Sequence, residues 1–224
     1  MSLYQQMISL VVFSVLATNA YASGKDDPKI RGQTWEHLRK RIYPYIGVEM
    51  PPPIEYSPTN YIHVLLFNDQ TRIYRCDFFQ TSNVFFSVSS IYMARSERDR
   101  PAQECQIHCK TNLVHDGIWT MFMEQMKKVG KTKPEGRPMA VGHPNYLVLI
   151  SAINGDARCF YYDSPHIDQD ERQITPLIEL AYMTFMQAEF DQKSHDHINR
   201  VLYGKTLPSH LPISSSESPM GSGL

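Results

Sequence analysis

The alternation of apolar and polar positions predicts four consecutive β-strands in the first half of the chain. A dense apolar run at 61–67 is typical of a strand buried on both faces. Polar turns at 68–71 and 80–83 separate it from strands expected at 72–79 and 84–93. A charged loop at 95–101 then leads to a fourth strand around 104–110. Short connections of this kind predict an antiparallel β-meander.

Helical spacing replaces this alternation before, between and after the strands. Trp35, Leu38 and Ile42 recur at three to four residues, and Pro44 is expected to end this first helix. A second helix is expected at 113–129 and a third from Thr175 to about Leu202.

A hairpin is predicted between the second and third helices. Its strands cover 146–153 and 158–163, and Asn154-Gly155 is a strong turn signal between them. The fold class we predict is therefore α+β, with an antiparallel β-meander plus a β-hairpin packed against about three helices.

The N-terminal residues predict export. Residues 7–17 are almost wholly apolar, and Ala20-Tyr21-Ala22 follows as a small-x-small cleavage site. The apolar run is shorter than the roughly 20 residues that span a membrane. We expect a signal peptide at 1–22, cut after Ala22, and a periplasmic or secreted mature protein. No Lys or Arg precedes the apolar run, so an uncleaved anchor is the alternative.

The remainder reads as a single domain with a tail. Residues 23–204 are long enough for one α+β domain with its own core, and 205–224 are rich in Ser, Pro and Gly, which predicts a disordered tail. The chain is 42% hydrophobic with a formal net charge of −1, so no overall electrostatic field favours binding to nucleic acid or to a membrane surface.

The stretch Glu104–Lys110 decides how the four cysteines are interpreted. As a strand, it would place Cys105, Ile107 and Cys109 on an apolar face and His108 on the wet face. In an oxidising compartment an even cysteine count predicts two disulfides. We expect Cys105 and Cys109 to be crosslinked to Cys76 and Cys159, in either order. If the stretch is helical instead, Cys105–Cys109 and Cys76–Cys159 become the pairs.

Metal and haem sites are disfavoured. Haem attachment needs Cys-x-x-Cys-His, whereas this stretch reads Cys105-x-x-His108-Cys109. Asp191 and His195 are spaced for one helix face, but the sequence supplies no third ligand. We predict no cofactor and no metal.

Two functions compete on this reading. We recognise no nucleophile elbow, zinc-protease motif or phosphate loop, which favours a non-catalytic binding or accessory protein such as an inhibitor, an immunity factor or an envelope-complex component. The alternative is a hydrolase-type enzyme whose site is assembled only in three dimensions. Its candidate residues are Asp77, His108, Asp116 and His195.

A basic segment is the candidate partner-binding surface. Five basic residues stand against one glutamate, at Lys127, Lys128, Lys131, Lys133 and Arg137. A surface of this charge can bind a protein or an anionic envelope component.

Overall fold

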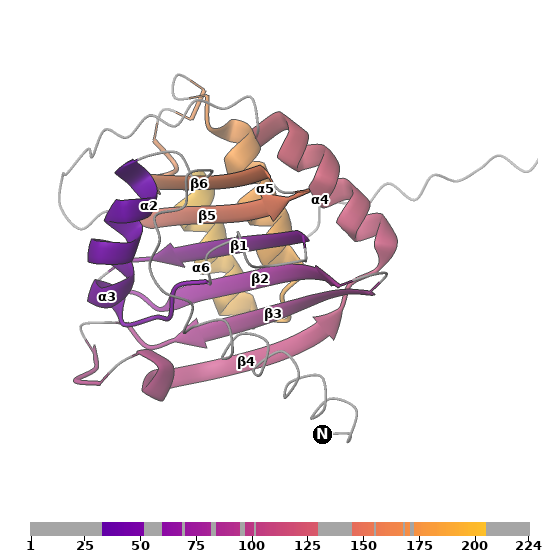
Figure 1. Cartoon of the computed structure of the whole chain (residues 1–224). Helices are drawn as coiled ribbons and strands as arrows, with labels where there is room; N and C mark the ends of the chain where they lie inside the picture. Colours follow the sequence, from indigo (N-terminus) through magenta and orange to yellow (C-terminus); the bar gives the residue numbers. More distant parts are fainter. Residues whose placement is uncertain are drawn as a thin grey trace, which may run out of the picture.

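The computed structural model describes residues 33–51, 60–68, 70–81, 84–94, 97–100, 102–129, 145–154, 156–167, 169–170 and 173–204. The predicted signal peptide and C-terminal tail lie outside these residues. Six antiparallel strands form one sheet in the order β4-β3-β2-β1-β5-β6 (Figure 1). They are β1 (Asn60–Phe67), β2 (Ile73–Thr81), β3 (Val84–Tyr92), β4 (Gln106–Leu113), β5 (Tyr146–Ile153) and β6 (Asp156–Asp163).

This sheet confirms the predicted meander and hairpin. Consecutive strands β1 to β4 pair in order, and the β5–β6 hairpin joins the other side of β1. Asn154 adopts a positive φ of 51° at the hairpin turn. An asparagine tolerates this left-handed conformation better than most residues, which is why Asn-Gly predicts such a turn.

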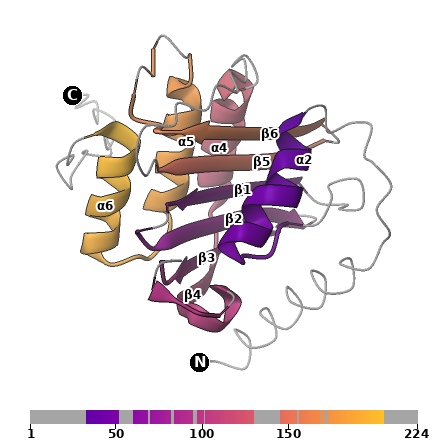
Figure 2. The same ribbon diagram turned by 90° about the vertical axis from the view of Figure 1, so that its left-hand side faces the viewer.

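Helices cover both faces of the sheet (Figure 2). The front face carries an N-terminal helical segment made of α2 (Gln33–His37), a π-helical turn η1 (Leu38–Ile42) and α3 (Tyr43–Ile46). The back face carries α4 (Asp116–Val129), α5 (Thr175–Met186) and α6 (Gln192–Tyr203). A short 3₁₀ turn, η4 (Ala102–Cys105), precedes β4. None of the helices in the described ranges is long and apolar enough to cross a membrane.

The N-terminal helical segment continues past Pro44, contrary to the sequence prediction. Pro44 stands at the start of α3, after a π turn in which the Tyr43 N–H donates to the Leu38 carbonyl. Proline is tolerated at a helix start because no N–H is needed there. The segment ends instead at Gly47, whose φ of 66° is the left-handed conformation of a helix C-cap.

The C-terminal helix is broken into two, although the sequence predicts one. Helix α5 ends at Met186, and Asp191 starts α6 by accepting the Ser194 N–H at 2.7 Å. Phe190 lies in the intervening turn and is 8% exposed, packed into the core beside Phe185. The turn therefore directs an aromatic side chain inward that a continuous helix would place elsewhere.

Two apolar layers hold the domain together, one on each face of the sheet. The back layer packs α4, α5 and α6 against the side chains of Ile62, Val64, Cys76 and Phe78, among others. The front layer packs the N-terminal helical segment, through residues such as Leu38 and Ile46, against Leu65, Phe67 and Ile150. Because successive side chains on a strand point to opposite faces, each central strand contributes to both layers.

Candidate functional site

A buried group of polar side chains lies in the front layer, between the sheet and the N-terminal helical segment. His63 on β1 and Asp77 on β2 are directly opposite each other across the two strands. The His63 Nδ1 and Asp77 Oδ1 atoms are 2.7 Å apart. His63 is 0% exposed and Asp77 is 3% exposed. Two groups that would each be costly to bury alone are therefore buried as a bonded pair.

Arg75 and Tyr43 extend this pair into a network. The Arg75 Nε donates to Asp77 Oδ2 at 2.6 Å, and its Nη1 donates to the Glu49 carbonyl at 3.0 Å. On the other side, the Tyr43 hydroxyl lies 2.6 Å from His63 Nε2. We call these four side chains, Tyr43, His63, Asp77 and Arg75, the buried network.

The charges in the buried network follow from its surroundings. Burial opposes ionisation of Asp77, but Arg75 and His63 outweigh it and lower the pKa of Asp77 to about 2. Burial lowers the pKa of His63 below its usual 6.5, although Asp77 offsets part of that effect. At neutral pH the network therefore pairs an ionised carboxylate with a neutral imidazole. His63 then donates through Nδ1 and accepts the Tyr43 hydroxyl proton through Nε2.

The order of groups in the buried network matches the hydroxyl, imidazole and carboxylate of a hydrolytic triad. Its burial does not, because Tyr43 is 2% exposed and burial raises the pKa of its hydroxyl well above 10. A nucleophile must reach its substrate and must be able to lose its proton. In this conformation the buried network instead joins α3 to the two central strands.

A second cluster, on the back face, surrounds Phe190. The ring centroid of Phe190 is 5.6 Å from that of His108 on β4 and 6.0 Å from that of His195 on α6. His108 Nε2 and His195 Nδ1 are both buried without a hydrogen-bond partner among the described residues. Burial lowers the pKa of both imidazoles, so both favour the neutral form. We call His108, Phe190 and His195 the histidine–phenylalanine cluster.

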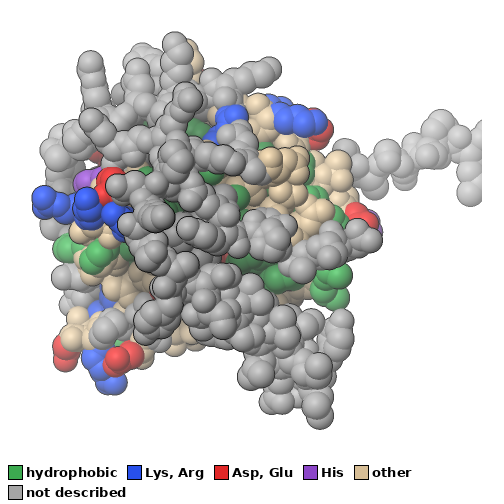
Figure 3. Space-filling model, in the orientation of Figure 1, with side chains coloured by type: hydrophobic (Ala, Val, Ile, Leu, Met, Phe, Trp, Pro, Cys, Tyr) green, Lys and Arg blue, Asp and Glu red, His purple; other side chains and the backbone are tan. Residues whose placement is uncertain are grey.

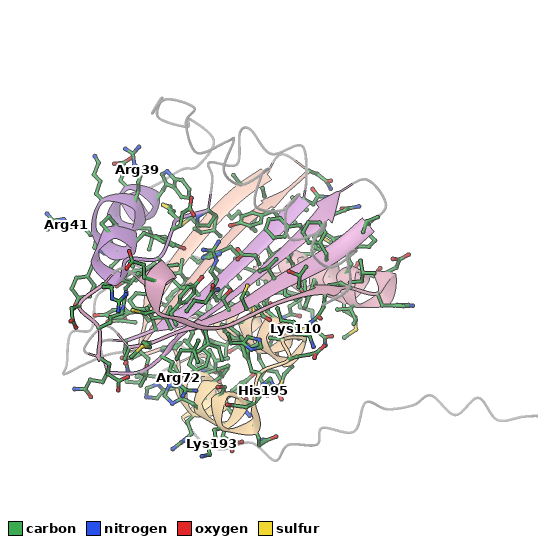
Figure 4. The ribbon with its side chains drawn as sticks, turned by 90° about the horizontal axis from the view of Figure 1, so that it is seen from below. Arg39, Arg41, Arg72, Lys110, Lys193 and His195 are labelled. Atoms are coloured by element: carbon green, nitrogen blue, oxygen red, sulfur yellow. The ribbon has the colours of Figure 1, made fainter. Side chains whose placement is uncertain are left out.

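Charged residues border this cluster at one edge of the molecule. Figure 4 shows Lys110 on β4, Arg72 before β2 and Lys193 on α6, on the same underside as His195 of the cluster. Lys110 forms an ion pair with Glu189, which joins β4 to the turn between α5 and α6. Asp191 raises the pKa of both His108 and His195, in opposition to burial, so it lies close enough to act on both rings.

The structure therefore separates the residues that the hydrolase hypothesis would bring together. Asp77 is in the front layer, whereas His108 and His195 each contact the ring of Phe190 on the back face. Asp116 begins α4, where the Thr120 hydroxyl donates to its carbonyl oxygen at 3.0 Å. No group of three or more His, Cys, Asp or Glu suited to a metal ion occurs within the described ranges.

The predicted disulfides are absent, because all four cysteines are described and all are free. Cys76 on β2 belongs to the back layer, whereas Cys159 on β6 packs against the front layer. Strands β1 and β5 lie between them, so their Cα atoms are separated by about 14 Å. A disulfide requires a Cα separation below about 7 Å, which excludes the Cys76–Cys159 pair expected for a helical stretch. The crosslinks expected from Cys105 and Cys109 to Cys76 and Cys159 were also wrong, because none of these thiols is bonded.

The Cys105 stretch also faces the opposite way from the prediction. Cys109 and Ile107 are exposed, whereas His108 points toward Phe190 in the back layer. Cys109 is opposite Ser90, and the Cys105 carbonyl accepts the Met93 N–H at 3.1 Å. Ser90 and Met93 are three residues apart on extended chain, about 10 Å, which also excludes a Cys105–Cys109 bond in this conformation.

The predicted basic surface is described in part. Lys127 and Lys128 are exposed on the last turn of α4, where positive charge is favoured by the helix dipole. Lys127 also forms an ion pair with Glu124 at 2.6 Å. Lys131, Lys133 and Arg137 lie outside the described residues.

Sequence reasoning missed both His63 and Phe190. A lone histidine inside the apolar run at 61–67 was the available signal for His63, since a buried imidazole requires a bonded partner. The partner, Asp77, is fourteen residues away, and only the register of β1 with β2 makes them neighbours. Phe190 had no comparable signal, because its position depends on the break between α5 and α6.

Comparison with protein-family models, curated proteins and solved structures finds no match to this chain.

Proposed function

We propose that this chain is an exported, non-catalytic binding or accessory protein. The observation that carries the proposal is that the four side chains of the buried network are hydrogen-bonded inside the domain. Each of them is bonded to another member or to the backbone, and His63 is 0% exposed. Groups held in this way stabilise a scaffold and are not available to a substrate.

Export is part of the proposal and rests on the apolar residues 7–17 and the cleavage site at Ala22. The measurement is the mass and N-terminal sequence of the chain recovered from the periplasm or the medium. We expect it to begin at Ser23. Recovery of the uncut chain in the membrane fraction would support the anchored alternative.

The partner surface we propose is the basic end of α4. A protein or an anionic envelope polymer would contact Lys127 and Lys128, which are exposed and are followed in the sequence by Lys131, Lys133 and Arg137. Opposite charge across an interface mainly accelerates association and selects the partner.

A charge-reversal experiment tests this surface. Lys127→Glu combined with Lys128→Glu is compared with Lys40→Glu combined with Arg41→Glu in the N-terminal helical segment. The pairs are matched, because all four residues are exposed and because each pair contains one ion-paired lysine. Lys40 is 2.6 Å from Glu36 in the N-terminal helical segment, as Lys127 is from Glu124 on α4. Figure 3 shows basic side chains gathered at that other side of the molecule.

The readout is affinity purification from the native envelope, followed by mass spectrometry. We expect the α4 variant to lose the partners that the wild-type chain recovers, and the control variant to keep them. Equal loss in both variants would mean that overall charge is responsible. Recovery of no stable partner by the wild-type chain, together with turnover of an envelope substrate, would reject the binding proposal.

The competing proposal is a hydrolase that uses Tyr43, His63 and Asp77, whose order is that of a triad. It requires a conformation in which the Tyr43 hydroxyl is exposed. His63→Gln would then abolish turnover of any substrate found, whereas in the binding proposal it changes stability alone.

A further inference from the structure

Strand β4 forms one edge of the sheet, at the bottom of the view in Figure 1. It pairs with β3 on one side, and within the described ranges no strand pairs with its other side. The outward N–H and C=O groups of an edge strand favour pairing with another strand. The first question is which residues supply those groups.

The register of β3 with β4 answers it. Val114 donates its N–H to the Phe85 carbonyl at 2.9 Å, so Val114 directs its backbone groups toward β3. Backbone direction alternates along a strand, and therefore Leu113, Thr111 and Cys109 direct theirs away from the sheet. A register shift between Ile91 and Tyr92 interrupts this alternation near Ile107. The regular outward ladder thus consists of Cys109, Thr111 and Leu113.

We propose that this edge pairs with the same edge of a second copy of the chain, in antiparallel orientation and with Thr111 on the two-fold axis. Thr111 then faces Thr111 of the second copy, and Cys109 faces Leu113 of the second copy. All three outward residues of each chain are bonded in this register. A shift of the axis to Lys110 or Asn112 leaves one of the three without a regular bonding partner.

Charge favours the same register. With Thr111 on the axis, Lys110 lies opposite Asn112 of the second copy, which avoids a like-charge contact. With Lys110 on the axis, the two lysines would face each other, which destabilises a strand pair. Lys110 is in addition already paired with Glu189 of its own chain.

The apolar side chains at this edge also fit a second copy. Tyr61, Phe79, Phe86 and Leu113 form one row across β1, β2, β3 and β4 on the front face. Exposure increases along the row from 5% at Tyr61 to 64% at Leu113. Figure 3 shows apolar side chains at the right, where β3 begins and β4 ends. Pairing places Cys109 of the second copy beside Leu113 and extends this row.

The outward ladder of Cys109, Thr111 and Leu113 has few of the features that commonly prevent pairing. Strand β4 has no proline, its one charged residue is the ion-paired Lys110, and the register shift lies near Ile107, outside this ladder. A two-fold pair is self-limiting, because each copy contributes its single β4 edge. The dimer is independent of the proposed binding function, since the basic end of α4 is a different surface.

Engineered disulfides test the register. Cys105 and Cys109 are replaced by Ser, and Thr111→Cys is introduced. The buried Cys76 and the partly buried Cys159 remain, because burial raises the pKa of both thiols. Paired Cα atoms in such a ladder are about 5.5 Å apart, within disulfide range. We expect mild oxidation to give a covalent dimer with Thr111→Cys and monomer with Asn112→Cys. A crosslink at Asn112→Cys, or none at Thr111→Cys, would overturn the proposed register.

Light scattering tests the dimer without new cysteines. The uncut chain has a mass of 25.9 kDa, and for the purified protein we expect twice the mass of its single chain at concentrations on the order of 100 μM. Leu113→Lys should raise the dissociation constant about tenfold or more, because symmetry counts each substitution twice. Met121→Lys is the control, since Met121 is 58% exposed on α4. A wild-type monomer at all concentrations, or equal weakening by Met121→Lys, would overturn the dimer.

Discussion

His63 and Asp77 are opposite each other on neighbouring central strands, and their side chains are joined at 2.7 Å in the interior of the domain. Arg75 neutralises the carboxylate from one side, and Tyr43 supplies a hydroxyl to the imidazole from the other. The network thereby connects the N-terminal helical segment to β1 and β2. Its energetic importance can be measured directly.

His63→Ala should lower the free energy of unfolding by about 3 kcal/mol. The substitution leaves a cavity, removes one bond to Asp77 and leaves the Tyr43 hydroxyl buried without its acceptor. Urea unfolding followed by circular dichroism measures the change. His115→Ala is the control, because His115 is exposed and accepts one N–H, from Gly117, at the start of α4. A loss below about 1 kcal/mol for His63→Ala would contradict this role.

Two buried tyrosines in the front layer should respond in opposite ways to loss of the hydroxyl. Tyr43→Phe removes the bond to His63 and should cost about 1–2 kcal/mol. The Tyr61 hydroxyl is buried without a hydrogen-bond partner among the described residues, so Tyr61→Phe should be neutral or stabilising. Each variant is compared with the wild type by thermal and urea unfolding. Equal destabilisation by the two substitutions would rule out this explanation.

Stability should fall in two stages as the pH is lowered. The pKa of His63 lies below its usual 6.5 in the folded state. At pH values between the folded and the unfolded pKa, the unfolded chain therefore binds more protons, and acid favours unfolding. The stability that depends on neutral His63 is therefore complete above pH 6.5 and is lost below it. Asp77 adds a second loss between pH 3.8 and its folded pKa of about 2.

Unfolding free energies at pH 7.5, 6.0 and 5.0 test the first stage. His108, His195 and His197 also have lowered pKa values, and they contribute in the same direction. The pH dependence should be shallower in His63→Gln than in the wild type, since the variant lacks one of these groups. An unchanged slope would assign the acid sensitivity to the back-face histidines.

The four thiols should react in an order set by their exposure and by how readily each forms a thiolate. Cys109 is exposed, Cys105 and Cys159 are partly exposed, and Cys76 is 1% exposed. A maleimide reagent added to the native protein should modify Cys109 first, then Cys105. Cys76 and Cys159 should react after unfolding, because burial suppresses the thiolate in both. An intact mass that increases on reduction would instead indicate a disulfide.

Much of the fold is recoverable from local patterns. The strands β1 to β3 and the β5–β6 hairpin follow from alternation and turn residues, which depend on neighbours a few positions away. The direction in which the β4 side chains point does not follow from such local patterns. Its Cys105 and Cys109 form the more apolar side by composition, yet His108 turns inward because Phe190 supplies a packing surface on the back face.

The candidate site was less predictable than the fold. The sequence marks Asp77 as a candidate but not the histidine that it binds, and it carries no information on which face of the sheet each of the four cysteines takes. An oxidising compartment and an even number of cysteines favour disulfides in general. Whether a particular pair can form depends on the separation of its two Cα atoms. Here the intervening strands hold Cys76 and Cys159 apart.

The α+β class and the positions of most strands follow from the amino-acid sequence, because alternation and turn chemistry act over a few residues. Tertiary structure alone decided that His63 bonds Asp77, that the cysteines stay apart, and that β4 directs Cys109 outward. These outcomes depend on strand register and on which helix covers which face. Both are set by packing between residues far apart in the chain.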